Sequence, residues 1–222
     1  MQRSINFVSM NVKLVAITKP IDDMSASDFI SYAARVSNPS NQNNTLTSPK
    51  LLAYCIKNGH WSIFEQASFT VEIVTSRAIS AQIIRHRSFS FQEFSQRYAV
   101  ATEFEPVEFR TQDLKNRQGS GDVINDLGIK CTFDDTVRFC ETTYLRMIGA
   151  GVSKETARMI LPLCTQTTLY MTGNVRSWIH YLEQRCAKGT QKEHRLIAET
   201  IRDEIFAVQF PAIHEALNYE KN

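Results

Sequence analysis

The chain has 222 residues, of which 43% are hydrophobic and 22% are charged, which fits one large domain or at most two small ones with a full core. Its 25 Lys and Arg residues against 23 Asp and Glu residues give a formal charge of +2, so no charge excess favours binding to nucleic acid or to an acidic membrane. No apolar run reaches transmembrane length, and polar residues interrupt the opening stretch before a signal-peptide core could form.

The first part of the chain predicts a strand followed by two helices. Residues 12–18 are typical of a short strand, and a helix is expected from Ser25, whose hydroxyl can cap it. A second helix is expected after a polar loop, with Ser48 and Pro49 at its N-cap and first-turn positions and Gly59 at its end.

The middle of the chain predicts a half-buried strand, a helix and a long connection. Residues 68–75 alternate apolar and polar side chains, which indicates a strand with one wet face, and a short helix is expected over residues 76–85. Residues 111–128 are polar and show no periodicity. They are expected to form a long surface connection or a flap, and the sequence does not choose between the two.

The second half of the chain is strongly helical. Helices are expected over residues 133–148 and 153–161, and a short strand over residues 169–171. A helix from Asn174 carries one apolar stripe, made of Val175, Trp178, Ile179, Leu182 and Cys186.

The last long helix is expected to begin at Thr190, where Glu193 completes a capping box, and to end at Pro211. Ile197, Ile201 and Ile205 form its inward face. Since helices dominate and the few strands do not alternate with them regularly, we expect an α+β fold rather than a doubly wound parallel sheet.

The cysteines and histidines do not indicate a disulfide framework or a metal site. The five cysteines are odd in number, far apart and without a Cys-x-x-Cys pair, which favours reduced, inert thiols in a cytoplasmic protein, or in the host cytoplasm if the chain is viral. No metal is expected, because the histidines lack ligand spacing: they are His60, His86, His180, His194 and His214. The Gly-x-Gly at Gly119 and Gly121 lacks the third glycine of a dinucleotide fingerprint.

Three arginines and three phenylalanines share one segment, residues 85–98, which lies in a stretch without any lysine. Arg85, Arg87 and Arg97 could bind a phosphate or a nucleotide, because a guanidinium donates two parallel hydrogen bonds. A basic edge strand whose Phe residues pack inward explains the pattern equally well. A single-stranded nucleic-acid binder with a stacking strip is a third possibility.

This segment resembles the signature of the flavin-dependent thymidylate synthases, Arg-His-Arg-x-x-Ser-x-Asn-Glu-x-Ser-x-Arg-Tyr, and departs from it only in having Gln92 at the Asn position. Further blocks are similar to the same family in the same order along the chain. These are residues 33–37 (AARVS), 59–65 (GHWSIFE), 157–162 (ARMILP) and 174–177 (NVRS), together with Gln191 and Glu193.

The resemblance implies a single helix-rich α+β domain with an antiparallel sheet, assembled as a homotetramer whose active sites lie where subunits meet. It implies conversion of dUMP to dTMP without an enzyme nucleophile. Methylenetetrahydrofolate would donate the one-carbon unit and NADPH would reduce a bound FAD, which would supply the hydride. A homologue that binds FAD and dUMP but has lost turnover stays open as an alternative.

The resemblance also implies site residues. Three of the assignments have a plainer explanation: a surface arginine for Arg185, a polar helix face for Arg176 with His180, and a partner of a helix end for His60. Arg185 would stabilise the uracil as an N3-deprotonated anion, and His60 would lie near the flavin and folate. FAD would be bound by Ser62, Arg85, His86, Arg87, Glu93, Asn174, Arg176 and His180. The dUMP ligand would be bound by Gln82, Arg85, Glu93, Ser95, Gln96, Arg97, Arg158 and Arg185, with Ser95 and Arg97 at the phosphate.

Overall fold

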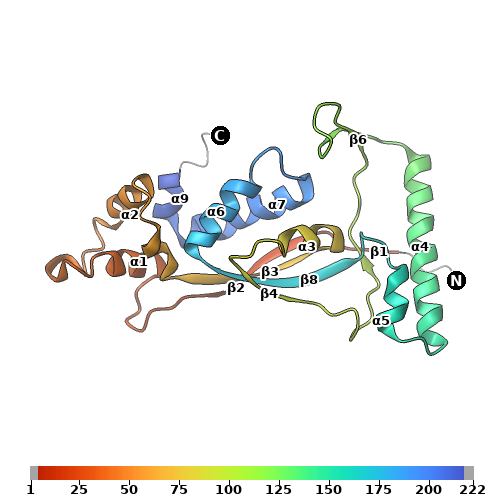
Figure 1. Ribbon diagram of the computed structural model, residues 1–222, viewed down its shortest axis with the longest axis horizontal. Coiled ribbons are helices and arrows are strands. Elements are labelled where there is room, and N and C mark those ends of the chain that lie inside the picture. Colours follow the sequence, from red (N-terminus) through yellow and green to blue (C-terminus); the bar gives the residue numbers. More distant parts are fainter. Residues whose placement is uncertain (1–4, 218–222) are drawn as a thin grey trace. The chain divides into compact units, whose positions relative to one another are not determined.

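The computed structural model describes residues 5–217 and has the expected α+β class, with many helices and a four-stranded sheet. The strand order is β2-β3-β8-β4, so β2 and β4 are the edge strands (Figure 1). The four strands are β2 (Asn11–Ile17), β3 (Ser68–Ser76), β8 (Gln166–Asn174) and β4 (Ser90–Glu93).

Neighbouring strands of this sheet run antiparallel, as expected. Backbone hydrogen bonds join the end of one strand to the start of its neighbour, which only antiparallel pairs allow. They run from Thr18 N–H to the Ser68 carbonyl (2.8 Å), from Val175 N–H to the Ala67 carbonyl (2.9 Å) and from Phe94 N–H to the Thr168 carbonyl (2.8 Å).

The described residues divide into two compact units. The first unit holds residues 5–11, Ile73–Arg85 and Gln92–Leu169, and the second holds Val12–Glu72, His86–Phe91 and residues 170–217. The single domain expected over residues 1–222 stays a prediction.

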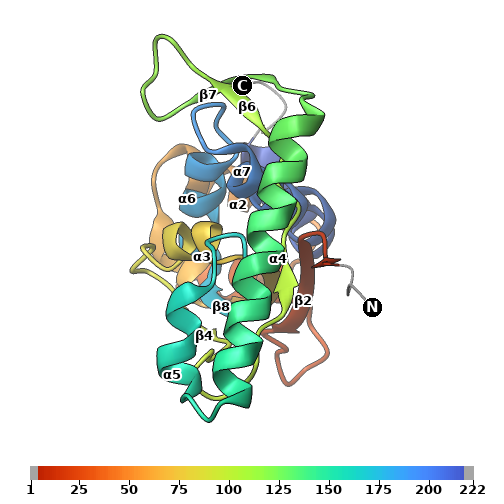
Figure 2. The same ribbon diagram turned by 90° about the vertical axis from the view of Figure 1, so that its right-hand side faces the viewer.

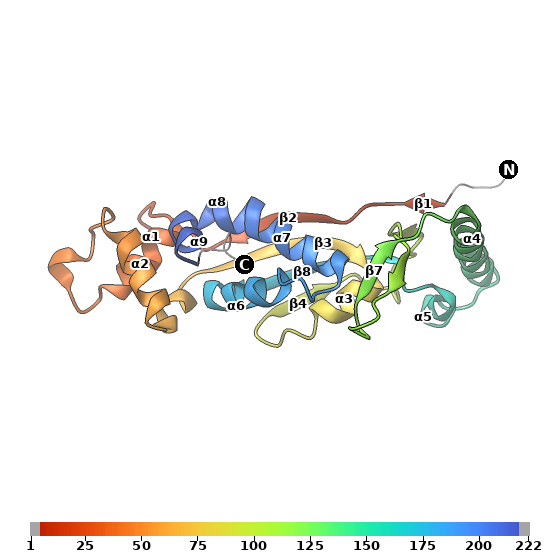
Figure 3. The same ribbon diagram turned by 90° about the horizontal axis from the view of Figure 1, so that it is seen from above.

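The second unit contains most of the helices. Ser25 caps the first of them as expected, because its Oγ accepts from Asp28 N–H at 3.0 Å. α9 packs against α2 (Figures 1 and 3). The helices are α1 (Ala26–Ala34), α2 (Ser48–Lys57), α6 (Val175–Arg185), α7 (Lys192–Thr200), α8 (Ala207–Gln209) and α9 (Pro211–Leu217), with a π-helical turn over Ile201–Phe206 and 3-10 turns η1 (Pro39–Asn41) and η2 (Trp61–Glu65).

Aromatic rings form the core of the second unit. Phe69, on the buried face of β3, stacks on Trp178 with ring centroids 4.4 Å apart, and Trp178 Nε1–H donates to the Phe69 carbonyl at 3.3 Å. Phe206 and Phe210 close the same cluster. The residues expected to face inward from β3 and from α7 with the π-helical turn are buried. Those of α6 are buried except Cys186, which is half-buried, and Tyr181 is an additional buried residue.

The first unit contains the long helix α4 (Leu127–Gly149), with α5 (Lys154–Ala157) alongside it (Figure 2). The remaining elements of this unit are α3 (Arg77–Ile83), the 3-10 turn η3 (Arg158–Ile160), the parallel pair β1 (Asn6–Phe7) and β5 (Glu103–Phe104), and the antiparallel pair β6 (Arg110–Gln112) and β7 (Ser120–Val123).

Several expected boundaries are wrong, and capping explains two of them. The connection expected over residues 111–128 contains most of the β6–β7 hairpin. α4 begins at Leu127 instead of residue 133 because Asp126 Oδ1 accepts from Gly128 N–H and Ile129 N–H. Thr190 Oγ1 donates to the Gln184 carbonyl instead of capping, so α7 begins at Lys192.

Three further boundaries also differ. Ser48 is the first residue of α2 rather than its N-cap, which is Thr47. β8 extends well beyond residues 169–171, and the helix expected over residues 153–161 is the short α5 followed by η3. Within residues 5–217, no helix is both long enough and apolar enough to span a membrane.

Candidate functional site

The arginine-rich segment contains β4, so the edge-strand explanation is right about its backbone. Phe89 is buried, whereas Phe91 and Phe94 are half-buried. Arg85, Arg87 and Arg97 are nevertheless exposed. All three arginines lie outside β4 itself, so the edge strand alone does not account for them. The site residues expected from the sequence divide between the two units.

In the first unit, Glu93 is held by three side chains. Arg77 Nη1 lies 2.7 Å from Glu93 Oε1, and Ser80 Oγ and Thr167 Oγ1 donate to the same oxygen at 2.5 and 3.1 Å. The Glu93 carboxylate is therefore held in place beside a guanidinium. The sequence interpretation missed Arg77, although this arginine lies in the same lysine-free stretch as Arg85.

The turn after β4 carries three more predicted residues. The Ser95 carbonyl accepts from Tyr98 N–H and Ala99 N–H at 3.0 Å, which closes a tight turn. Arg97 donates from Nε and Nη2 to Glu155 Oε2 at 3.2 and 3.0 Å, in an exposed ion pair. Gln96 is buried, and among residues 5–217 its Nε2 has no hydrogen-bond partner.

The other predicted residues of the first unit lie on short helices. Gln82 is half-buried near the end of α3, and Arg85 follows this helix. Arg158 is half-buried at the start of η3, three residues beyond Glu155. Gln92, at the position where the signature has Asn, is exposed on β4.

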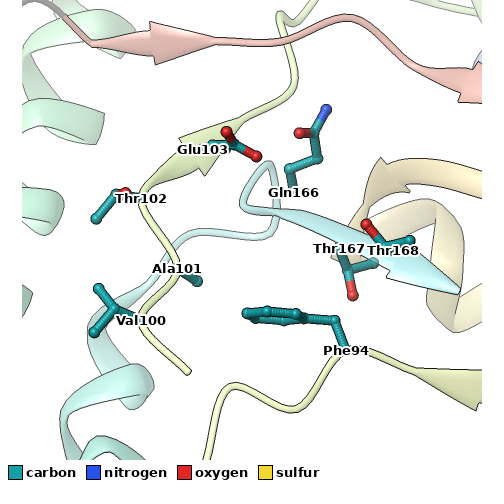
Figure 4. A pocket seen from close by; sticks show the side chains of 8 residues that line it. All are labelled: Phe94, Val100, Ala101, Thr102, Glu103, Gln166, Thr167 and Thr168. Atoms are coloured by element: carbon teal, nitrogen blue, oxygen red, sulfur yellow. The ribbon is translucent and has the colours of Figure 1, made fainter. Parts of the chain in front are cut away.

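A pocket of about 280 Å³ lies in the first unit beside this turn (Figure 4). The Phe94 ring and the Thr167 side chain point toward its interior. None of its lining residues was expected as a site residue, because the pocket joins two segments far apart in the sequence: Phe94, Val100, Ala101, Thr102 and Glu103 with Gln166, Thr167 and Thr168.

In the second unit, η2 and the first turns of α6 bring polar and aromatic side chains together. Arg176 Nη1 donates to Glu65 Oε1 at 2.5 Å, and the rings of Trp61 and His180 lie 5.0 Å apart. Ser62 is exposed on the same turn of η2. Trp61 and Glu65 were missed as functional residues, although both lie in the GHWSIFE block.

Two predicted residues of this unit have local structural roles. Asn174 caps α6, since its Oδ1 accepts from Ser177 N–H at 2.8 Å. The exposed ring of His60 lies edge-on to Tyr54 with centroids 5.8 Å apart. The backbone N–H of His60 donates to the Cys55 carbonyl at 2.8 Å, so this backbone group, rather than the imidazole, satisfies the end of α2.

Arg185 and His86 form the most direct contact between two predicted residues. Arg185 Nε–H donates to His86 Nε2 at 2.8 Å. Burial, and secondarily the charge of Arg185, lower the pKa of His86 to about 4. Arg185 is therefore not an ordinary surface arginine of α6.

A second histidine lies behind this pair. His194 is fully buried, and its Nε2 is 3.1 Å from the Tyr181 hydroxyl. Burial, followed by the charges of Arg185 and His86, lowers the pKa of His194 to about 3. Burial also raises the pKa of Tyr181. Both imidazoles are therefore neutral near pH 7.

These two histidines predict a loss of stability in acid. Above the unfolded-state pKa of about 6.5, these imidazoles are unprotonated in both the folded and the unfolded protein, so they do not lower the free energy of unfolding. As the pH falls from about 6.5 toward 4, only the unfolded protein gains protons, and the free energy of unfolding decreases. Urea unfolding at pH 7, 6 and 5 should show this decline. In His194→Gln the free energy of unfolding should fall less steeply with decreasing pH, because up to about one proton fewer is taken up on unfolding. An unchanged slope would contradict the assignment.

Comparison with known proteins gives one matching family, and the similar proteins are named for the same activity. The model of the family described as thymidylate synthase complementing protein matches residues 19–212. A probable flavin-dependent thymidylate synthase of Paramecium bursaria Chlorella virus 1 is 48% identical over 216 residues, which covers 95% of this chain and all of the relative. The flavin-dependent thymidylate synthase of Synechocystis is 49% identical over 218 residues, with the same coverage.

A solved structure shares the fold. The crystal structure of a UMP/dUMP methylase, PolB from Streptomyces cacaoi, bound with 5-Br dUMP, superposes with a TM-score of 0.82 at 25% identity. It covers 96% of each chain.

Proposed function

The chain belongs to the thymidylate synthase complementing protein family, and from that premise we propose that it is a flavin-dependent thymidylate synthase that converts dUMP to dTMP. One observation carries this proposal. Two relatives named for this activity are about half identical to the chain along nearly its whole length. Methylenetetrahydrofolate would donate the one-carbon unit, and NADPH would be the reductant.

The side chains of the second unit fit a flavin dinucleotide. Arg176 can pair with a pyrophosphate once Glu65 yields, and Trp61 and His180 offer ring faces to a planar group. When bound, the flavin supplies the hydride that completes the methyl group. The residues that would hold it are Ser62, His86, Arg87, Asn174, Arg176 and His180 in this unit and Arg85 and Glu93 in the first.

Arg185 would activate the pyrimidine. C5 of uracil is a weak nucleophile until negative charge spreads through the ring, and a guanidinium beside the N3-deprotonated base stabilises that charge. A guanidinium supplies this positive charge without a proton transfer. His60 would lie near the flavin and folate.

The proposal uses no sulfur nucleophile, and three of the five cysteines are poor candidates for one. All five are free. Burial raises the pKa of Cys164 and of Cys186 to about 11 and also raises the pKa of Cys55. These three thiols are therefore almost entirely protonated near pH 7, and a protonated thiol does not add to C6 of the uracil. This chemistry favours charge stabilisation over covalent catalysis.

The first unit would bind the nucleotide. Ser95 and Arg97 would hold the dUMP phosphate, helped by Gln82, Arg85, Glu93, Gln96 and Arg158. Glu155 now accepts both hydrogen bonds from Arg97. The incoming phosphate must therefore replace this carboxylate.

Removing the Glu155 charge should strengthen dUMP binding. In Glu155→Gln we expect KM for dUMP to fall by up to about fivefold with kcat unchanged, because an exposed ion pair is weak but competes directly for Arg97. Steady-state kinetics at fixed ionic strength would measure this change. Glu204→Gln, at an exposed position in the second unit, is the charge-matched control. An unchanged or raised KM in Glu155→Gln alone would contradict the phosphate role of Arg97.

The assembly and location are also proposals. A homotetramer with active sites where subunits meet is supported by large exposed apolar side chains in the first unit, including Leu127, Phe139, Met159 and Leu163. A cytoplasmic location is supported by the free thiols. Light scattering would give the mass of the assembly.

The visible spectrum of the purified protein tests the cofactor directly. A flavoprotein should be yellow and should bleach when NADPH and dUMP are added without oxygen. Absence of flavin even after incubation with FAD would refute the proposed function.

A further inference from the structure

The Arg185 guanidinium is held from behind by a neutral ring. Its Nε–H donates to His86 Nε2 at 2.8 Å, and an imidazole nitrogen that accepts a hydrogen bond carries no proton, so the remaining proton of His86 lies on Nδ1. A guanidinium has five N–H donors in a fixed plane. With Nε–H occupied, the edge formed by one N–H of Nη1 and one N–H of Nη2 points away from His86.

We propose that His86 is a positioning residue for the thymidylate synthase reaction, because its Nε2 fixes the plane and direction of the Arg185 guanidinium. The proposal rests on the proposed function. The hydrogen bond restrains rotation about the Cδ–Nε bond, so the Nη1–Nη2 edge remains the open fork for a planar, negatively charged partner. Without this bond, several guanidinium orientations would compete, and only some would meet the charge that develops in the pyrimidine.

The surroundings of His86 hold its ring still. The ring of Tyr181 meets it edge-on at a centroid distance of 4.9 Å, and Phe89 and His194 meet it at 6.4 and 6.3 Å. Tyr181 in turn contacts His194 through its hydroxyl. These packed rings restrict the side chain of His86, so its nitrogen is a fixed acceptor.

Burial and the neighbouring cation also preserve the acceptor. The pKa of His86 is lowered to about 4, first by desolvation and then by Arg185. A protonated imidazole could not accept from Arg185 and would repel it. The imidazole of His86 therefore remains unprotonated near pH 7 and can accept the hydrogen bond from Arg185.

A matched pair of amides tests this inference. The side-chain oxygen of Gln can occupy the place of His86 Nε2, whereas the shorter Asn side chain cannot reach it, and both are neutral. We expect His86→Asn and His86→Leu to lower kcat by about 10- to 100-fold, as for other residues that orient an active-site group. His86→Gln should recover most of that loss, with KM for dUMP changed by less than about threefold in all three.

Rates are to be expressed per bound flavin, and thermal unfolding is to be measured for each variant, because His86 was also expected to contact FAD. His214→Leu, a histidine replacement elsewhere in the second unit, is the control. If His86→Leu fails to fold, the comparison of Asn with Gln decides the question.

The outcomes separate the two proposals. Full activity in His86→Asn, or equal losses in His86→Asn and His86→Gln at normal flavin content, would overturn the positioning role and leave the proposed function intact. A wild-type protein that binds flavin but forms no dTMP would overturn the proposed function, and the positioning role with it.

Discussion

Replacing Arg185 by lysine lowers kcat for dTMP formation by at least about 100-fold, the cost typical of losing a donor that stabilises developing charge. Lysine keeps the charge but loses the planar fork and the Nε–H that bonds to His86. Because Arg185 is half-buried in the last turn of α6, the variant should still fold. Single-turnover kinetics with dUMP, folate and NADPH would measure the loss.

The control for this prediction is Arg195→Lys. Arg195 is also a half-buried helical arginine of the second unit, with an ion pair to Glu199 at 3.6 Å, and it has no proposed role in the reaction. It should keep the parental rate. If Arg185→Lys also turns over at the parental rate, the activation of uracil by this guanidinium is wrong.

Replacing Gly173 by alanine destabilises the protein by about 1–3 kcal/mol, the usual cost of forcing an extra carbon into a packed core. A Cβ at this position would lie 2.5 Å from the Cδ1 and Cε1 atoms of the Phe89 ring. That ring is buried and lies against Trp178 at a centroid distance of 4.7 Å, so it has little space to yield. Urea unfolding would measure the loss.

Two further variants isolate the cause. Gly149→Ala, at the end of α4, meets no atom within 4 Å and should not destabilise the protein. In a Phe89→Leu background, the cost of Gly173→Ala should shrink, because a smaller side chain relieves the overlap. An equal cost in both backgrounds would show that Phe89 is not the obstacle. Displacement of Phe89 would also disturb His86, three residues before it, so activity should fall as well.

Local patterns predicted much of the fold. The alternation of β3 and the apolar stripe of α6 are read from neighbouring residues, and both were confirmed because each element buries one face. The β6–β7 hairpin was missed because its strands are exposed and carry no apolar alternation. The start of α4 was missed because the signal was one capping aspartate rather than an apolar face.

The sequence predicted which residues belong to the candidate site, but not which contacts they make. The family signature supplied the candidates, but it does not state what each side chain contacts. Arg97 and Glu155 are 58 positions apart and Arg176 and Glu65 are 111 apart, so their pairing depends on the tertiary fold. The contact of Arg185 with His86, across 99 positions, is of the same kind. Periodicity and spacing carry no information about such pairs.

Release of tritium from C5 of labelled dUMP tests the central claim most directly, because methylation must remove the hydrogen at that carbon. With methylenetetrahydrofolate and NADPH, the flavin-loaded protein should release tritium in step with dTMP formation. Protein that binds dUMP and a reducible flavin, yet releases no tritium above a control without protein, would contradict the account.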